Sequence, residues 1–331
     1  MAELRWHPLL ETWVIVSSHR QGRPHLENGP CPFCPNSGLV PDNYVIYTYD
    51  NDFPSLSLEP PEPDTAGDEL IPVRPAFGKC EVTLYSPQHE VTLPELPLDH
   101  ITRLVDHWEE RYRELGAIEG IDYVFIFENR GEAVGVTMIH PHGQIYAYPY
   151  IPLKMQTELA SCKKHWLKNK SCLICDLLQH EKSDGSRMVY RNAGFSAFVP
   201  PFAEFPYQVY IVADQHVGSL STMQPAERRG LATALKCITG AYDSLFGVPF
   251  PYMMCIYQNP TDENDYPHHH FHIEFYPPMR APDKLKFNAA SETGAWATIN
   301  DTSPEERAAE LRGKVAMQLE QLEDLEPDDP R

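Results

Sequence analysis

The segment His140-Pro-His-Gly-Gln144 carries the most information about the fold and function of this chain. Alternate residues of a β-strand point to the same face of a sheet, so the pattern predicts a polar row of His140, His142 and Gln144. A neutral imidazole attacks phosphorus well and passes the phosphoryl group on, which makes His142 a candidate nucleophile. Gln144 could donate its amide to a phosphoryl oxygen, and Gly143 permits close backbone approach. The alternative is an ordinary hydrogen-bonded strand histidine.

A second copy of this pattern follows 130 residues later, as His270-Phe-His-Ile-Glu274 (270 − 140 = 130). Each half of the chain contains, in the same order, a Cys-x2-Cys pair, a histidine, an asparagine and a His-x-His motif. The members are Cys31, Cys34, His89, Asn129, His140 and His142 in the first half, and Cys172, Cys175, His216, Asn259, His270 and His272 in the second. The asparagine precedes the motif by the same distance in both halves (140 − 129 = 270 − 259 = 11). This shared order predicts an internal duplication.

The apolar pattern around these motifs predicts mixed helix and strand. Apolar residues at helical spacing, followed by glycine, predict helices over residues 99–115 and 225–246. Strands are predicted at residues 44–49, 80–85, 123–128, 144–147, 208–212, 252–257 and 271–276. We therefore expect an α+β fold of two antiparallel halves, residues 1–160 and 161–331, linked around residues 152–170. Residues 54–75 are predicted as an irregular surface loop and residues 320–331 as a frayed terminus.

The cysteine pairs favour metal sites, because two thiolates and two imidazoles make a usual tetrahedral Zn²⁺ site. His140 is preferred to His142 as a ligand, since a metal-bound ring nitrogen could not also attack phosphorus. Such a site is structural and would fix the strand that carries His142. The predicted ligands are Cys31, Cys34, His89 and His140 at site 1, and, by the duplication, Cys172, Cys175, His216 and His270 at a possible site 2. The alternative is a reduced, packed cysteine pair without metal.

The bulk composition argues against nucleic-acid and membrane partners. Lys and Arg total 27 and Asp and Glu total 47, a net charge of −20, whereas surfaces that bind duplexes or membranes are usually basic. The chain contains no apolar run of about 18 residues and no N-terminal leader pattern, so we expect a cytoplasmic location. In that compartment, Cys-x2-Cys pairs such as the two among the eight cysteines indicate metal sites or redox sites more readily than structural disulfides.

Further motifs spread over almost the whole chain. They are Arg5-Trp-His-Pro-Leu9, Trp13-Val-Ile-Val-Ser-Ser-His-Arg20, Asn51-Asp-Phe53, Ser86-Pro-Gln-His89, Leu93-Pro-Glu-Leu96, Phe127-Glu-Asn129, Asp184-Gly-Ser-Arg187 and Phe275-Tyr-Pro-Pro278. With the His-Pro-His-Gly-Gln motif, this pattern resembles the galactose-1-phosphate uridylyltransferase family, a branch of the histidine-triad superfamily. The resemblance implies a duplicated histidine-triad-like fold, with two antiparallel β-sheet halves and flanking helices.

The resemblance also implies a ping-pong reaction. UDP-glucose would give UMP to His142, and galactose 1-phosphate would then take it to yield UDP-galactose, with Gln144 contacting the transferred phosphoryl group. The substrate-binding residues implied are Arg20, Arg23, Asn51, Asp52 and Asn129 around the uridine and phosphates, and Lys286, Phe287, Glu292 and Asn300 around the hexose. The same resemblance implies Zn²⁺ at site 1 and a homodimer with active sites built across its interface.

A second metal site in some family members uses one glutamate and three histidines. Glu158 and His272 match two of those positions, whereas Glu274 stands where a histidine is expected. The second cysteine pair offers a different set of ligands for a second metal.

Other functions stay open from the residues alone. The same nucleophile would suit another donor, as in an ADP-sugar or dinucleotide phosphorylase or adenylyltransferase of the superfamily. A non-enzymatic zinc-binding module would explain the cysteines, but it would not need Gly143 and Gln144. A hydrolase of the small histidine-triad kind usually has a further histidine in place of Gln144, and glutamine cannot act as a general acid.

Overall fold

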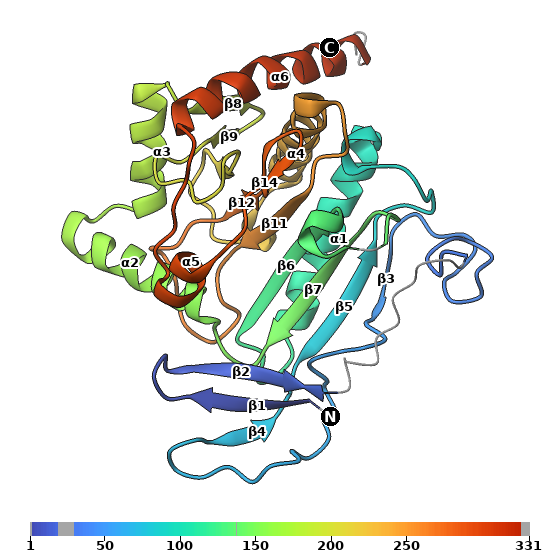
Figure 1. Cartoon of the computed structure of the whole chain (residues 1–331), viewed down its shortest axis with the longest axis vertical. Coiled ribbons are helices and arrows are strands. Elements are labelled where there is room, and N and C mark those ends of the chain that lie inside the picture. Colours follow the sequence, from blue (N-terminus) through green and yellow to red (C-terminus); the bar gives the residue numbers. More distant parts are fainter. Residues whose placement is uncertain (1, 19–29, 137, 326–331) are drawn as a thin grey trace.

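The computed structural model describes residues 2–18, 30–136 and 138–325 of the 331-residue chain. These residues form one large sheet, two small sheets and the helices around them (Figure 1). Within these ranges, no helix combines the length and the apolar character that a membrane span requires.

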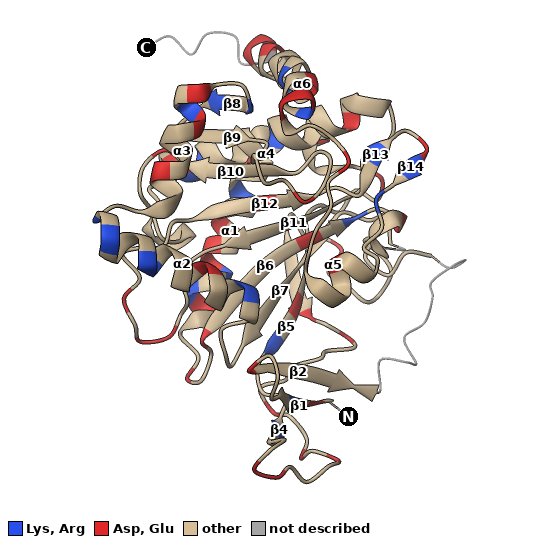
Figure 2. Ribbon diagram, turned by 60° about the vertical axis from the view of Figure 1, so that its left-hand side comes forward, with Lys and Arg blue, Asp and Glu red and all other residues tan. Residues whose placement is uncertain are grey.

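The large sheet has nine strands, and every neighbouring pair is antiparallel. The strand order is β3-β5-β7-β6-β11-β12-β10-β9-β8, which Figure 2 shows from β5 upward. The strands are β3 (Tyr47–Asp50), β5 (Lys79–Leu84), β6 (Tyr123–Arg130), β7 (His142–Tyr148), β8 (Met188–Asn192), β9 (Phe195–Phe198), β10 (Val209–Ala213), β11 (Tyr252–Tyr257) and β12 (His272–Tyr276).

The order of the strands follows the repeat in the sequence. β6 and β11 lie at the centre, flanked by β7 and β12 and then by β5 and β10. In each half a long helix comes directly before the central strand, α1 (Leu98–Gly116) before β6 and α4 (Pro225–Phe246) before β11. The predicted α+β fold with antiparallel sheets is confirmed. The structure adds that the two halves share one continuous sheet, because β6 pairs with β11.

The register places the two copies of the motif on the same face of the sheet. Gln144 is paired with Phe127, Phe127 with Cys255, and Cys255 with Glu274. Residues directly opposite each other on neighbouring strands share a face. Gln144 and its counterpart Glu274 therefore lie in one row, with two strands between them.

The helices α1 and α4 cover the opposite face. One isoleucine from each of the four central strands, at most 1% exposed, forms the core there: Ile126, Ile145, Ile256 and Ile273. The buried residues of α1 follow a single stripe at helical spacing, which explains why this segment forms an amphipathic helix. Both helices were predicted, α4 with the same bounds and α1 within one residue at each end.

Some segments differ from their predictions. The expected link at residues 152–170 is mostly the helix α2 (Leu153–Asn169), which is followed by α3 (Leu173–Asp184). The buried residues of α2 are few, Met155, Leu159 and Cys162, so its apolar pattern is weak. The segment 320–331, predicted to be frayed, is helical as far as residue 325 because α6 (Pro304–Leu325) packs against α4. The rest of that segment lies outside the described residues.

The small sheets lie outside the repeat. β1 (Ala2–His7), β2 (Thr12–Ser17) and β4 (Val73–Pro75) form a three-stranded sheet in the order β2-β1-β4. Residues 54–75 are irregular as predicted, except that the last three form β4. β13 (Met279–Ala281) and β14 (Lys284–Leu285) form a hairpin that leads to the short helix α5 (Ala290–Ala295).

Candidate active site and metal centres

His142 is the first residue of β7, and the backbone of His140 holds its ring. Nδ1 of His142 lies 2.7 Å from the carbonyl oxygen of His140. Because a carbonyl oxygen only accepts hydrogen bonds, Nδ1 carries the hydrogen and Nε2 carries the lone pair. The nitrogen that could attack phosphorus is therefore Nε2.

Gln144 follows on the same face of β7. The half-buried residues of this strand, His142, Gln144, Tyr146 and Tyr148, alternate with buried ones. The hydroxyl of Tyr146 donates to Oε1 of Gln144 at 3.3 Å, so the NH₂ group of this amide is its remaining polar group. The predicted polar row is wrong in one respect: His140 comes before β7 begins and is fully buried. The row on the sheet begins at His142.

Site 1 contains the four predicted ligands. The ligand atoms of Cys31, Cys34, His89 and His140 all lie within 4.8 Å of one another. The Sγ···Nδ1 distances are 3.7 Å and 3.8 Å from His140 to the two cysteines and 3.5 Å from His89 to Cys34. Tetrahedral Zn²⁺ with ordinary bond lengths separates sulfur and nitrogen ligands by about 3.6 Å. The geometry therefore fits a tetrahedral metal ion.

A hydrogen bond orients the ring of His140 so that its Nδ1 faces the two thiols. Its Nε2–H donates to the carbonyl oxygen of Ser86 at 2.7 Å, which turns Nδ1 toward the thiols. Such a second hydrogen bond sets the tautomer and the orientation of a metal-binding histidine. Burial lowers the pKa of His140 to about 4, so the ring is neutral at pH 7. His142 is not a member of this group.

Site 2 repeats the arrangement in the second half. Cys172, Cys175, His216 and His270 have all their ligand atoms within 4.8 Å of one another. Nδ1 of His270 lies 4.0 Å and 3.2 Å from the two thiols, and Nδ1 of His216 lies 3.4 Å from Sγ of Cys175. Both Cys/His groups could therefore hold a metal ion.

Gly143 lies over a buried tyrosine, a contact that the sequence did not reveal. A Cβ at Gly143 would lie 2.2 Å from Oη of Tyr85 and 3.1 Å from the carbonyl oxygen of Phe127. Tyr85 is 1% exposed, so its ring cannot easily move aside. The apolar position of Tyr85 at the end of a strand gave no signal of this role.

We expect Gly143→Ala to lower the free energy of unfolding by about 1–3 kcal/mol, because the added methyl overpacks the space above Tyr85. The displaced strand would also misplace His142 and lower turnover. Thermal unfolding and steady-state kinetics measure both effects. Adding Tyr85→Phe removes the atom in closest contact, so the double variant should recover part of the loss. A single variant that behaves like the native protein would contradict this explanation.

Glu128 is a buried carboxyl group on the helix-covered face, beside the site. The hydroxyl of Tyr252 donates to its Oε1 at 3.0 Å. Burial raises the pKa of Glu128 to about 7, although the charge of Arg130 and the hydrogen bond from Tyr252 act to lower it. The folded protein therefore binds the proton of this carboxyl more tightly than the unfolded chain does.

This raised pKa predicts a pH-dependent stability. The folded state holds the proton between about pH 4.5 and pH 7 while the unfolded state releases it, so the stability contributed by Glu128 falls as pH rises through that window. Glu128→Gln removes the titration. We expect the variant to gain up to about 3 kcal/mol over the native protein at pH 8 and little at pH 5. Urea unfolding of both proteins at each pH measures this difference, and an equal difference at the two values would contradict it.

The residues implied for substrate binding that the structure describes lie in three places: on β6, directly after β3, and between β14 and α6. Arg20 and Arg23 lie outside the described residues. Asn129 is on β6, two residues beyond Phe127 on the same face, and Asn51 and Asp52 follow β3 directly. The main-chain N–H of Asn51 donates to the carbonyl oxygen of Cys80 at 2.9 Å, which ties this segment to β5.

The four residues implied for the hexose lie between β14 and α6. Lys286 and Glu292 are paired, with Nζ 3.6 Å from Oε1. Nδ2 of Asn300 donates to the carbonyl oxygen of Ala203 at 3.0 Å, which ties the segment to the connection between β9 and β10. Phe287 is 76% exposed. The segment thus has internal contacts and presents an exposed aromatic ring.

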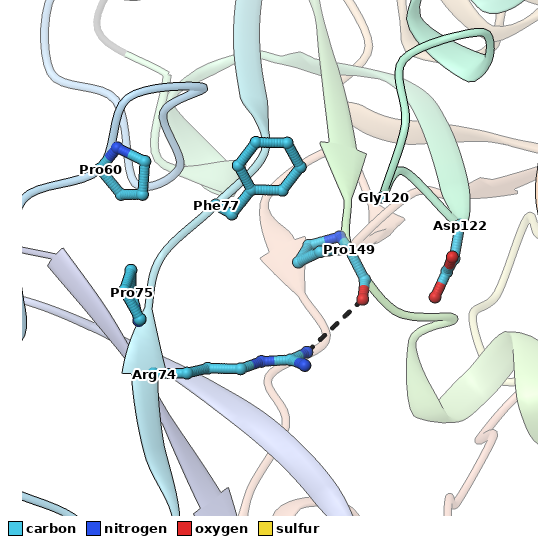
Figure 3. Close-up of a pocket in the computed structure, with 7 residues that line it drawn as sticks. All are labelled: Pro60, Arg74, Pro75, Phe77, Gly120, Asp122 and Pro149. Carbon is cyan, nitrogen blue, oxygen red and sulfur yellow. Dashed lines mark hydrogen bonds between the residues drawn. The ribbon is translucent and has the colours of Figure 1, made fainter.

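A pocket of about 550 Å³ lies elsewhere, between the three-stranded sheet and the ends of the central strands of the large sheet (Figure 3). Nη2 of Arg74 donates to the carbonyl oxygen of Pro149 across it at 3.5 Å. Its lining residues are Pro60, Arg74, Pro75, Phe77, Gly120, Asp122 and Pro149, and the set includes none of the predicted site residues. The candidate site is instead on the face of the sheet that carries His142.

Comparison with known proteins agrees with this arrangement. Residues 1–152 match the model of the galactose-1-phosphate uridyl transferase N-terminal domain, and residues 158–317 match that of its C-terminal domain. The galactose-1-phosphate uridylyltransferase of Thermotoga maritima is 41% identical over 94% of this chain and 98% of its own length. The corresponding protein of Haemophilus influenzae is 33% identical over 93% of both chains.

A solved uridylyltransferase structure has a TM-score of 0.87 and 33% identity, covering 96% of this chain and 99% of its own. The resemblance drawn from the motifs is thus confirmed over most of the chain. The chain belongs to the galactose-1-phosphate uridylyltransferase family.

Proposed function

We propose that the protein is a UDP-glucose–hexose-1-phosphate uridylyltransferase that carries UMP on Nε2 of His142. First, Nε2 bonds to the α-phosphorus of UDP-glucose, the bond from that phosphorus to the bridging oxygen breaks, and glucose 1-phosphate leaves with the electron pair. A phosphate oxygen of galactose 1-phosphate then attacks the same phosphorus. The P–N bond breaks, its electron pair returns to Nε2, and UDP-galactose is formed. Membership of the family supports these substrates.

The neighbouring groups suit this transfer. The hydrogen bond from Nδ1 to the His140 carbonyl keeps the lone pair on Nε2 and stabilises the positive charge of the phosphorylated ring. The NH₂ group of Gln144 would donate to an oxygen of the transferred phosphoryl group. The leaving group of the first step is a phosphate of low basicity, and that of the second is the imidazole of His142, which leaves as a neutral ring without needing a proton, so the absence of an acid at Gln144 costs little.

One observation carries the proposal. The ring of His142 is held by the backbone of His140, while the ring of His140 belongs to the metal-binding group. This arrangement supports a structural role for His140 and a chemical role for His142, as a covalent carrier requires.

The proposal extends to the metal ions, the domains, the assembly and the substrate-binding residues. We infer that both Cys/His groups hold Zn²⁺ and that the chain divides into halves at residues 1–160 and 161–331. We also infer a cytoplasmic homodimer with active sites across its interface and with no nucleic-acid or membrane partner. The exposed ring of Phe287, beside paired Lys286 and Glu292, supports a role for that segment in contacting the hexose. Asn51, Asp52 and Asn129 would surround the nucleotide together with Arg20 and Arg23.

Intact mass after incubation with a single donor tests the proposal. We expect UDP-glucose without acceptor to add one UMP per chain at the peptide that contains His142, and ADP-glucose to add nothing. Galactose 1-phosphate should then discharge the adduct. Adenylylation alone would favour the ADP-sugar or dinucleotide phosphorylase alternative. A protein that binds metal but captures neither nucleotide would favour the non-enzymatic module.

A further inference from the structure

The second half carries a structural copy of the active-site histidine. Nδ1 of His272 lies 2.9 Å from the carbonyl oxygen of His270, as Nδ1 of His142 lies 2.7 Å from that of His140. The surroundings differ, because His272 is 4% exposed and its ring stacks on Tyr257 with centroids 4.9 Å apart. The ring of His272 is therefore buried, whereas that of His142 is partly exposed.

Two carboxylates face the copied histidine. Glu158 of α2 and Glu274 of β12 have ligand atoms within 4.8 Å of each other and of His272. Nε2 of His272 lies 3.3 Å from Oε1 of Glu274, and both side chains are at most 5% exposed. One imidazole and two carboxylates are a set that divalent metal ions bind readily.

A lysine reaches into this set from outside. Nζ of Lys154, at the start of α2, lies 2.6 Å from Oε2 of Glu274 and 3.5 Å from Oε1 of Glu158. It also donates to the hydroxyls of Tyr257, at 2.8 Å, and of Tyr276. The side chain is 46% exposed, and its ammonium contacts the buried carboxylate of Glu274. Basic positions of α2 are visible in Figure 2.

These contacts do not fit the metal site of one glutamate and three histidines that the resemblance implies for some relatives. Glu274 stands at a histidine position, and a fixed positive charge already lies beside both carboxylates. A divalent cation bound there would be repelled by the ammonium at close range. The lysine also satisfies the charge of Glu274, which a buried carboxylate requires.

We propose that the ammonium of Lys154 takes the place of a metal ion among Glu158, His272 and Glu274, so that the native protein binds no ion there. Lys154 thereby closes the second copy of the active site. In the second half, the group that could still hold a metal ion is then Cys172, Cys175, His216 and His270.

Metal stoichiometry tests this proposal independently of catalysis. The full-length protein, Lys154→Met and the double variant Lys154→Met/Glu274→Gln are loaded with Co²⁺, desalted and analysed for bound metal per chain. We expect Lys154→Met to bind one equivalent more than the native protein, and the double variant to return to the native value. The additional ion should show no sulfur-to-cobalt charge-transfer band, because its ligands are oxygen and nitrogen.

Two further variants serve as controls. Lys182→Met removes a different ion-paired lysine, whose Nζ lies 2.7 Å from Asp214, and should keep the native stoichiometry. Lys154→Arg keeps the positive charge and should also keep the native metal stoichiometry. A non-thiolate cobalt ion in the native protein would overturn the proposal, and that measurement needs no variant to fold. A folded Lys154→Met that binds no additional ion would overturn it as well.

Discussion

Replacement of His142 by alanine is expected to abolish uridylyl capture and to lower turnover by about 10⁴-fold or more. The substitution removes Nε2, which the bond to the His140 carbonyl identifies as the lone-pair nitrogen. Gln144, the next polar residue on this face, has an amide side chain that is not a nucleophile toward phosphorus. His142 is half-buried, so we expect a stability change of only about 0.5 kcal/mol. Intact mass after UDP-glucose, steady-state kinetics, metal content and thermal unfolding test these expectations together.

The duplication supplies a matched control, His272→Ala. This residue has the same position in its motif and the same bond to the preceding histidine carbonyl. We expect the variant to keep uridylyl capture, but to lose stability because its ring is buried against Tyr257. Capture of UMP by His142→Ala, or an equal loss of capture in both variants, would refute the role assigned to His142.

Much of the fold could be predicted because the repeat left a clear periodic pattern. The helix α1 has a single buried stripe, α4 is buried on most sides over residues 230–242, and all seven predicted strands have counterparts in the large sheet. The pairing of β6 with β11 could not be predicted, since it depends on backbone hydrogen bonding at two strand edges and leaves no mark on side-chain pattern. The helix α2 was mistaken for a link because few of its residues are buried.

Only part of the candidate site could be predicted from the sequence. The candidate metal-binding sets could be chosen because cysteine spacing and the repeat limited the choice, and the structure brings all eight side chains into two groups that could hold a metal ion. The contact of Gly143 with Tyr85 and the ion pair of Lys154 with Glu274 join distant segments. Such contacts follow from packing, and neither single residue carries a motif. Arg20 and Arg23 remain predictions, since they lie outside the described residues.

Removal of site 1 is expected to affect catalysis, whereas removal of site 2 is expected to affect stability alone. The reason lies in His140, which offers Nδ1 to the metal group and its carbonyl oxygen to the ring of His142. A metal ion bound there would therefore hold the residue that orients the proposed nucleophile. At site 2, His270 has the same double role toward His272, which has no part in the proposed transfer.

We therefore expect Cys34→Ala to lose one metal ion per chain and to lower kcat by about 10–100-fold, as is usual when the support of a site residue is removed. Cys175→Ala should also lose one ion but should keep kcat within about twofold in the fraction that remains folded. Both variants should melt earlier, because a closed metal site contributes its binding free energy to folding. Metal analysis, thermal unfolding and kinetics on the same preparations compare the two. Equal losses of kcat would show that site 1 stabilises the fold generally and does not position His142.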